Sequence, residues 1–427
     1  MPTMTYPGTA SEQTYIEVTG GVDTHKDTHT AAALDGSGRL LGHREFAATA
    51  AGYAALLAWL GTLGQLVRVG VEGSGVYGAG LARFLQAAGV ELVEVDRPDR
   101  KTRRWQGKSD PVDAEAAARA AQAGRASGVP KTRGGKVDAL RALRVARRSA
   151  VAARADAQRQ IKALIVTAPD ALRMTLRGLG DRELIAHCAT RRPDRAAVGD
   201  PTVAAMLALR ALARRHQQLS VEIDELDALI GPLVTAINPT LIGLSGVGTD
   251  VAGQLLVTAG DNPQRLRSEA AFAMLCGAAP LPASSGRTHR HRLNRGGDRQ
   301  ANAALYRIVL CRLRWDPRTR AYAQRRTTEG MSKPEIIRCL KRYLAREIYT
   351  ALLDPQPSSV PAITSTAPEA STWSARSAAR TNDVCDTRSH SASERIDWGS
   401  ADAEGVVPSQ CSRLVPVLAG VVGNRGV

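Results

Sequence analysis

Four acidic residues stand where strands should end and a helix should begin. Asp23 closes the segment I-E-V-T-G-G-V-D, and Glu72 closes L-V-R-V-G-V-E. Asp110 and Asp113 are three apart in K-S-D-P-V-D-A, a spacing that puts both side chains on one side of a helix start. Gathered carboxylates repel one another unless a cation lies between them, and Mg²⁺ prefers oxygen ligands. The pattern therefore predicts two Mg²⁺ ions about 3.5–4 Å apart, clamping the oxygens of a phosphoryl transfer.

Each acidic residue taken alone also has a structural interpretation. Asp110 directly precedes a proline, as an N-cap residue does at the start of a helix. Asp27 and Asp35 lie in turn-like segments, and we leave them out of the site. It is the set of four acids, in this order of strands and helix, that favours a metal site.

A glycine-rich segment offers a competing interpretation. Residues 73–78 read G-S-G-V-Y-G after a strand and before a helix, and Asp96 follows the next strand 18 residues later. That layout is typical of dinucleotide-binding domains. However, Glu72 would repel a pyrophosphate there, and a pI near 10.1 is unusual for a dehydrogenase. Dinucleotide binding is therefore the weaker alternative.

A second segment with candidate catalytic residues spans 276–302, C-G-A-A-P-L-P-A-S-S-G-R-T-H-R-H-R-L-N-R-G-G-D-R-Q-A-N. Ser284 and Ser285 lie there in a loop rich in Pro and Gly, just ahead of several arginines. A serine nucleophile needs charge stabilisation, which guanidinium groups give a phosphodiester through paired hydrogen bonds. A flexible loop that only contacts phosphate fits the spacing equally well. The arginines expected to bind nucleic acid are Arg287, Arg290, Arg292, Arg295 and Arg299.

Strand and helix patterns alternate along the first part of the chain, after a polar leader at 1–16. The expected strands are 16–23, 28–35, 39–46, 66–72 and 90–95, and the expected helices are 47–63, 79–88 and one from 110. Mixed strands followed by β-α-β units predict an α/β domain over 17–125. The four acidic residues fall at the ends of its elements.

The rest of the chain has a helical pattern followed by a polar tail. Residues 126–235 repeat apolar residues three and four apart, as a coiled coil does, which fits an internal bundle and an oligomerisation arm about equally. Residues 236–352 form a mostly helical unit that opens with L-S-G-V-G. Gly246 and Gly248 in that motif fit a helix-hairpin-helix, whose backbone N–H groups bind phosphate. The Pro/Ser/Thr-rich composition of 353–427 predicts a disordered tail.

Basic residues are concentrated in two parts of the sequence. The chain holds 57 Lys+Arg against 41 Asp+Glu, a formal charge of +16. Residues 131–164 hold 10 basic against 2 acidic residues, and 286–346 hold 17 against 4. A high-GC genome would enrich arginine without making the clusters so one-sided. Such density favours a polyanionic partner, and nucleic acid is the default.

Two other classes of protein are disfavoured by the sequence. No apolar run of 18 residues could cross a membrane, and the first 20 residues lack the order of a signal peptide, so we expect a cytoplasmic protein. Six cysteines are scattered without a C-x-x-C pair or zinc-ligand spacing. A disulfide framework and a structural metal are therefore not expected.

The motifs taken together resemble bacterial insertion-sequence transposases that join an N-terminal DEDD domain, like that of Holliday-junction resolvases, to a C-terminal serine domain. The matching pieces are G-V-D-T-H-K, V-G-V-E-G-S-G, K-S-D-P-V-D-A, L-S-G-V-G and G-A-A-P-L-P-A-S-S-G followed by R-G-G-D-R-Q-A-N. They occur in the family's order and span about 18–352. The leader and the tail have no counterpart that we can place.

The resemblance implies an RNase H-like fold for 17–125, with Asp23, Glu72, Asp110 and Asp113 as the Mg²⁺-binding tetrad. It implies that Ser285, directly before glycine, joins covalently to DNA, although Ser284 stays open as the nucleophile. It also implies double-stranded DNA, a structured guide RNA and a homo-oligomer, dimer or tetramer, as partners, and a place on the nucleoid when DNA is bound. The alternative function is a structure-specific nuclease that uses the same tetrad with water as nucleophile.

Overall fold

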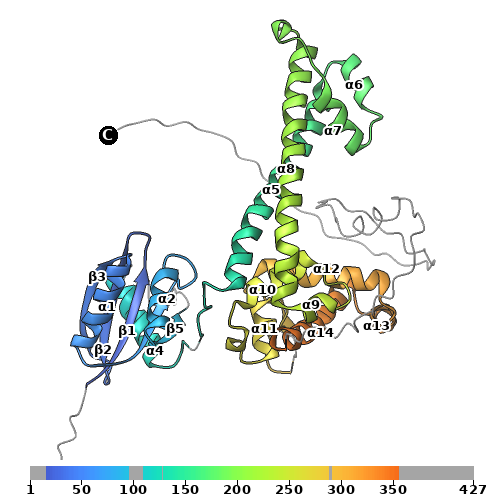
Figure 1. The fold of residues 1–427 in the computed structure, drawn as a ribbon. Helices are drawn as coiled ribbons and strands as arrows, with labels where there is room; N and C mark the ends of the chain where they lie inside the picture. Colours follow the sequence, from blue (N-terminus) through green and yellow to red (C-terminus); the bar gives the residue numbers. More distant parts are fainter. Residues whose placement is uncertain (1–15, 96–108, 127, 288–290, 355–427) are drawn as a thin grey trace, which may run out of the picture. The chain divides into compact units, whose positions relative to one another are not determined.

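The computed structural model describes residues 16–95, 109–126, 128–287 and 291–354 of the 427-residue chain. Five strands of the first part form one mixed sheet, coloured blue in Figure 1. They are β1 (Glu17–Thr24), β2 (Thr28–Asp35), β3 (Leu40–Ala47), β4 (Gln65–Glu72) and β5 (Glu91–Val95). Their order is β3-β2-β1-β4-β5, antiparallel from β3 to β1 and parallel from β1 to β5. The expected α/β domain with its antiparallel first strands is confirmed.

Helices cover both faces of this sheet. Helices α1 (Ala50–Thr62) and α2 (Ala79–Ala87) pack on one face, where Val18 and Val22 of β1 join Val69 and Val71 of β4 in a buried core with Leu56, Leu60, Leu81 and Leu85. Helix α4 (Asp110–Gln122) packs on the other face. Because side chains alternate along a strand, the odd-numbered residues of β1 and the even-numbered residues of β4 face α4.

Two glycines let α4 lie directly on the sheet. A Cβ built on Gly21 of β1 would lie 2.1 Å from the Ala118 nitrogen, and one on Gly70 of β4 would lie 2.7 Å from the Ala117 oxygen. The contacting face of α4 is made of alanines, Ala114, Ala117, Ala118 and Ala121, all buried. Glycine against alanine thus sets a helix-to-sheet distance that larger residues could not reach.

The middle of the chain is built around two long helices. Helix α5 (Lys136–Thr167) pairs with Asp227 of α8 (Pro201–Ile237) through Arg147, at 2.9 Å, and with Ser220 through Arg154, at 3.5 Å. The partner number falls as the α5 number rises, so the two helices are antiparallel, as Figure 1 shows. Their apolar seam is thus at least partly used within one chain. An oligomerisation role for this arm remains a prediction.

The far end of the arm carries a small core of its own. Between α5 and α8 the chain forms α6 (Asp170–Leu176), α7 (Asp181–Thr190) and the short 3-10 helix η1 (Arg195–Ala197). Leu172, Leu184 and Cys188 pack there against Ile161 of α5 and Leu209 of α8.

The C-terminal part is helical around a single core. Its helices are α9 (Pro239–Gly243), α10 (Thr249–Ala259), η2 (Pro263–Arg265), α11 (Glu269–Leu275), α12 (Arg299–Trp315), α13 (Pro317–Thr328) and α14 (Lys333–Leu353). Two short strands, β6 (Leu281–Pro282) and β7 (His291–Arg292), interrupt them as a hairpin. Phe272, Leu305 and Ile348 are fully buried in the core, which Leu140 of α5 and Val234 of α8 also join.

The segment ahead of α5 is fastened to these C-terminal helices. The Lys131 Nζ donates a hydrogen bond to the Val257 oxygen at 2.9 Å, and burial lowers the pKa of Lys131 to about 8. The Asn262 Oδ1 accepts from the Thr132 nitrogen at 3.0 Å, and Asp261 accepts from the Val137 nitrogen at 2.8 Å in the first turn of α5. These contacts join α5 and the C-terminal core into one unit.

The described residues show neither a membrane-spanning helix nor a disulfide bond. None of their helices is both long and apolar enough to cross a membrane. Cys188, Cys276, Cys311 and Cys339 are free thiols in the described part of the chain. The predictions made for residues 1–15 of the leader, for 355–427 of the tail and for Asp96 and Arg290 fall outside the described residues. Leu353, counted in the predicted tail, is the last residue of α14.

Candidate metal centre and serine hairpin

The first two acidic residues are placed by neighbouring parallel strands. Asp23 ends β1 and Glu72 ends β4, so both lie at the same edge of the sheet. Because side chains alternate along a strand, both residues lie on the face of the sheet that α4 covers. The Thr24 Oγ1 donates a hydrogen bond to the Glu72 carbonyl at 2.8 Å and ties the two strand ends together.

The other two acidic residues begin α4. Asp113 is 3% exposed and lies on the alanine face that contacts the sheet. The helix starts at Asp110, and Ser109 is its N-cap residue, so the N-cap interpretation of Asp110 is wrong. Asp200 and Asp316 also precede prolines, and there the aspartate is the N-cap and accepts backbone hydrogen bonds. With Ser109 as the N-cap, the Asp110 carboxylate is left for the site.

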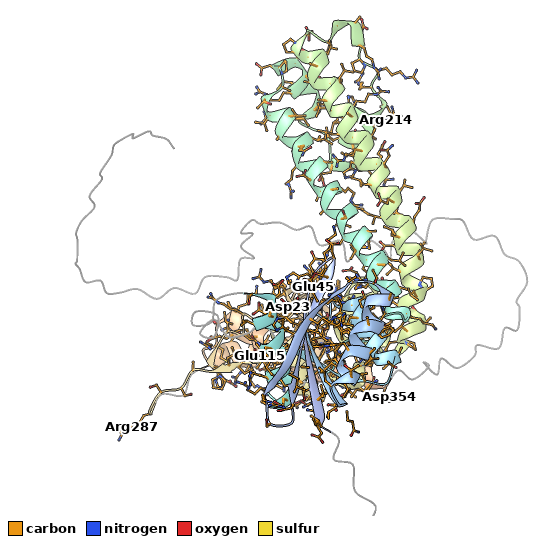
Figure 2. The ribbon with its side chains drawn as sticks, turned by 90° about the vertical axis from the view of Figure 1, so that its left-hand side faces the viewer. Asp23, Glu45, Glu115, Arg214, Arg287 and Asp354 are labelled. Atoms are coloured by element: carbon orange, nitrogen blue, oxygen red, sulfur yellow. The ribbon has the colours of Figure 1, made fainter. Side chains whose placement is uncertain are left out.

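The acidic residues converge with a histidine between them. The His25 Nδ1 lies 3.9 Å from the Asp23 Oδ2, and the His25 Nε2 lies 3.8 Å from the Asp110 Oδ1. One ligand atom from each of these three residues falls within 4.8 Å of the others. Figure 2 labels Asp23, which is almost fully buried.

The surroundings of Asp23 disfavour the charged form of its carboxyl group. Burial raises the pKa of Asp23, and repulsion from Asp113 and Asp110 raises it further, while His25 acts in the opposite direction. A cation bound here would relieve both the burial and the repulsion. Carboxylates are hard oxygen donors and imidazole is a common metal ligand, so the residues fit a divalent ion.

The structure thus brings two of the four predicted acids, Asp23 and Asp110, together around His25. The charge of Asp113 raises the pKa of Asp23 further. Glu72 is half-buried at the end of the adjacent strand. Sequence analysis missed His25, although it lies in the G-V-D-T-H-K motif, because a histidine in a turn has no distinctive spacing.

The glycine-rich segment forms a closed turn between β4 and α2. The buried Ser74 donates its hydroxyl hydrogen bond to the Glu94 Oε1 at 2.8 Å, and the Gly75 carbonyl accepts from Arg133 at 2.7 Å. The Gly78 and Val76 nitrogens donate to the Gly73 carbonyl at 3.3 and 3.0 Å. Polar groups that a pyrophosphate would need are thus engaged within the protein, which disfavours the dinucleotide interpretation.

Ser285 lies in the connection between β6 and β7. Ser284, Ser285 and Arg287 are all exposed, and Gly286 adopts a φ of +54°, in the left-handed region that favours glycine. Figure 2 shows the Arg287 side chain extending outward. A serine displayed on an exposed turn is accessible to a large substrate.

The motif R-G-G-D-R-Q-A-N holds the base of this hairpin. Gly297 has a φ of +85°, and a Cβ there would lie 2.6 Å from the Leu275 oxygen. Asp298 is the N-cap of α12 and accepts from the Thr258 hydroxyl at 2.6 Å, while the Asn302 amide donates to the Cys276 carbonyl at 2.8 Å. These residues support the hairpin, and Arg292, Arg295 and Arg299 of the predicted arginines remain exposed around it.

The L-S-G-V-G motif joins α9 to α10. Gly246 has a φ of +77°, and Gly248 is the N-cap of α10. Asp250 in the first turn of α10 accepts from Arg144 at 2.9 Å and from Arg307 at 2.6 Å. The helix–turn–helix geometry fits the predicted phosphate contact, which stays a prediction.

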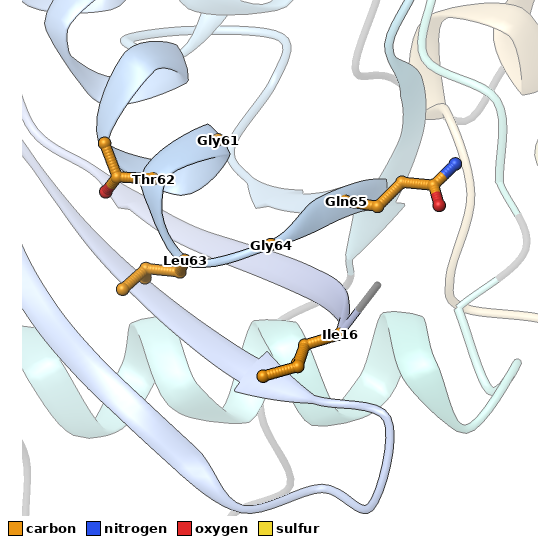
Figure 3. A pocket seen from close by; sticks show the side chains of 6 residues that line it. All are labelled: Ile16, Gly61, Thr62, Leu63, Gly64 and Gln65. Carbon is orange, nitrogen blue, oxygen red and sulfur yellow. The ribbon is translucent and has the colours of Figure 1, made fainter. Parts of the chain in front are cut away.

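A shallow hollow lies elsewhere on the α/β domain. Figure 3 shows its lining, Ile16 with residues 61–65. Ile16 precedes the first residue of β1, whereas Asp23 is near its end, about 23 Å away along the strand. The hollow therefore belongs to the edge of the sheet opposite the acidic residues.

Comparison with known proteins places these features among transposases. Residues 20–168, which include the four acidic residues, match a family model described as a transposase. Residues 239–324, which include Ser285, match the transposase IS116/IS110/IS902 family. The two segments are therefore assigned by similarity to transposases, the second of them to the IS116/IS110/IS902 family.

Two curated relatives support the assignment over part of the chain. An insertion element IS110 protein of Streptomyces coelicolor is 32% identical over 132 residues, 30% of this chain and 32% of the relative. An insertion element IS900 protein of Mycobacterium paratuberculosis is 30% identical over 146 residues, 34% of this chain and 37% of the relative. The chain therefore matches about a third of the length of each relative.

Proposed function

We propose that the protein is a DNA transposase that moves an insertion sequence by Mg²⁺-dependent phosphoryl transfer with a serine nucleophile. The observation that carries the proposal is the cluster of Asp23, His25 and Asp110, whose possible ligand atoms lie within 4.8 Å of one another. Burial and repulsion from Asp113 and Asp110 raise the pKa of Asp23 there. The strand order β3-β2-β1-β4-β5, with acids at the ends of β1 and β4, supports an RNase H-like fold for this domain.

The acidic residues would hold the metal. Asp23, Glu72, Asp110 and Asp113 are the proposed ligands of two Mg²⁺ ions, which when bound supply charge stabilisation to the reacting phosphate. Asp113 is fixed in place because its helix packs directly on Gly21 and Gly70. His25 lies within 4 Å of two carboxylates and would orient them.

Ser285 would carry the covalent step. Its hydroxyl oxygen attacks the phosphorus and gives up its proton, the bond from phosphorus to the 3′ oxygen breaks, and that oxygen leaves as a 3′-OH. The phosphoserine link preserves the phosphodiester energy, so a partner strand's 3′-OH can rejoin the DNA without ATP. The exposed Arg287, Arg292, Arg295 and Arg299 would offset the phosphate charge.

The partners follow from charge and from the helical arm. Double-stranded DNA, and a structured guide RNA, suit a chain of net charge +16. A homo-oligomer, dimer or tetramer, is supported by exposed apolar residues along the arm, Val145, Val221 and Leu229. It would let the acidic domain of one protomer act with the serine hairpin of another.

Replacing one acid tests the metal-dependent step. We expect Asp113→Asn to lower Mg²⁺-dependent DNA cleavage more than about 100-fold, because even an outer-shell change at a metal site costs about 10- to 100-fold. Asp27→Asn, an acid in the turn after β1, is the matched control and should keep activity within about 2-fold. Equal activities of the two variants would count against the acidic cluster as the catalytic centre.

Replacing the serines separates the transposase from a nuclease that uses water. The wild type should form a covalent protein–DNA adduct that is stable in denaturant. Ser285→Ala should abolish the adduct and Ser284→Ala should keep it. Cleavage by Ser285→Ala without loss of rate would instead support the structure-specific nuclease.

RNA bound to the purified protein tests the guide. The protein would be purified from cells that carry its flanking DNA, washed in high salt to remove loosely held polyanion, and its RNA sequenced. One discrete RNA that maps to the edge of the element is expected. Heterogeneous RNA, or none, would mean that the protein recognises DNA unaided.

A further inference from the structure

The glycine loop, residues 73–78, follows Glu72 directly and has no role in the function proposed so far. Its two ends are closed against β1. Gly73 has a φ of +72°, and a Cβ there would lie 2.9 Å from the Thr24 Oγ1. A Cβ on Gly78 would lie 2.9 Å from the Thr24 Cγ2. Thr24 directly follows Asp23, so the loop is built onto the acidic edge of the sheet.

The sides of the glycine loop are also fixed. Ser74 is buried and bonded to Glu94, and the Gly75 carbonyl accepts from Arg133. The Val76 nitrogen closes a turn onto the Gly73 carbonyl at 3.0 Å. Close packing at both ends and hydrogen bonds at one side therefore anchor the backbone of the loop.

This anchored loop presents two apolar side chains to solvent. Val76 is 71% exposed and Tyr77 is 54% exposed. Single exposed apolar residues are ordinary on protein surfaces. Two in succession on an anchored turn, four and five residues after a proposed metal ligand, instead form a small preorganised contact surface. Preorganisation lowers the entropic cost of binding.

The neighbouring chemistry identifies what would bind there. The acidic edge acts on a phosphodiester in the proposed function, and Lys26 is exposed in the loop that follows β1 at the same edge. A strand whose phosphate reaches that edge carries bases on both sides of it. A tyrosine ring stacks on the face of any base, but only on one that has left the duplex stack.

We propose that Tyr77, supported by Val76, stacks on an unpaired nucleobase beside the phosphate that the acidic residues act on. The inference rests on the proposed function and gives it a substrate preference. The site would favour branched or opened DNA over continuous duplex. Tyr77 would act as a positioning residue, because it touches a base and not the reacting atoms.

Binding of full-length protein to two DNA probes tests this role. One probe is a four-way junction with unpaired bases at its centre, and the other is a continuous duplex of the same length. Ca²⁺ replaces Mg²⁺ so that binding is measured without cleavage. Tyr77→Ala should weaken binding of the junction about 10-fold, while binding of the duplex changes less than about 2-fold. Tyr77→Phe should restore junction binding, because it keeps the ring.

The controls separate this inference from the proposed function. Met174→Ala removes an apolar side chain of the arm that is 64% exposed, against 54% for Tyr77, and should leave both affinities unchanged. The melting temperature of Tyr77→Ala should match that of the wild type, because the ring is exposed. Equal weakening on both probes, or none on the junction, would overturn the role of Tyr77. If the wild type binds the junction through Tyr77 but does not cleave DNA with Mg²⁺, the proposed function fails and the role of Tyr77 in binding still stands.

Junctions made of RNA identify the strand that Tyr77 contacts. The same two probes are prepared with ribose in place of deoxyribose. Tyr77→Ala should weaken binding of the DNA junction, whether or not it also weakens binding of the RNA junction, because the ring contacts the base and not the sugar. An effect confined to the RNA junction would overturn a contact with the strand that is cut.

Discussion

The chemistry of the acidic site depends on which residue caps a helix. In the described part of the chain, three aspartates precede proline at a helix start, and two of them, Asp200 and Asp316, accept backbone hydrogen bonds as N-caps. At the third start Ser109 takes that position, and Asp110 moves one residue into the helix. The Asp110 carboxylate then lies 3.8 Å from His25, instead of accepting hydrogen bonds from backbone N–H groups of the helix start.

A buried histidine near the same edge should make the protein sensitive to acid. His29 is fully buried and stacks on Tyr53 with ring centroids 5.6 Å apart. Burial lowers the pKa of His29, with His25 adding to the effect. Below about pH 6.5 the unfolded chain takes up a proton that the folded chain refuses, so stability is lost as pH falls.

His29→Phe should remove part of this acid sensitivity, because it keeps a stacking ring and has no group to protonate. The melting temperature of wild type and variant would be compared at about pH 7.5 and pH 5, both in EDTA. The wild type should lose more on acidification than the variant. An equal loss in both proteins would show that His29 is not the cause.

Individual residues were only partly predictable from the sequence. Asp23, Asp110 and Asp113 could be found because strand ends and helix starts are visible in hydrophobic periodicity. The position of the N-cap could not be predicted, because Ser and Asp are equally good N-cap residues and Ser109 and Asp110 are adjacent. His25 could not be found because its role depends on the distance between two segments 87 residues apart, Asp23 and Asp110.

At the scale of elements, the site is positioned by the close packing of α4 on the sheet. Gly21 and Gly70 face an alanine surface, and a Cβ on either would overlap the helix backbone. This contact delivers Asp113 to the strand ends. We therefore expect the two glycines to determine where Asp113 lies.

Gly21→Ala should push α4 away from β1. We expect it to destabilise the protein by about 1–3 kcal/mol, as overpacking does, and to lower cleavage because Asp113 moves. Gly61→Ala is the matched control: Gly61 lies in α1 with nothing within 4 Å of a Cβ, so alanine should be neutral or add up to about 1 kcal/mol. Denaturant unfolding and a cleavage assay would measure both. Full activity of Gly21→Ala would contradict the packing argument.

The sequence predicted the strands of the α/β domain better than the breaks in the helical middle. Alternating residues and tight turns fixed β1 and β2, and the structure confirms their antiparallel pairing. The interruption of the arm by α6 and α7 was not anticipated, although Asp200-Pro201 is the same start pattern that marked α4. The β6–β7 hairpin was expected only as a loop, since two-residue strands leave no periodicity to recognise.

For the whole molecule, binding is expected to be dominated by charge. The chain holds 57 basic and 41 acidic residues. Its basic residues are concentrated in two segments: 131–164, most of which forms α5, and 286–346, most of which forms α12, α13 and α14. Polyanion binding of this kind releases counterions and weakens steeply with salt.

The exposed arginines beside Ser285 should contribute to that salt dependence. Replacing Arg295 and Arg299 together with alanine should reduce the slope of log K against log salt by about 1.8, since each phosphate contact contributes about 0.9. Arg214→Ala, on the exposed face of the arm labelled in Figure 2, should leave the slope unchanged. Affinity for duplex DNA at several salt concentrations measures it. An unchanged slope in the double variant would remove these arginines from the interface.

The central claim is that the acidic residues form a metal site, and thermal unfolding with and without Mg²⁺ tests it most directly. In EDTA, Asp23→Asn should melt above the wild type, because it removes a buried charge whose pKa is raised by burial and by Asp113 and Asp110. With Mg²⁺ the wild type should gain stability, by about 2.7 kcal/mol at 100 times the dissociation constant, and the variant should gain little. Equal stabilisation of both proteins by Mg²⁺, or of neither, would contradict the account.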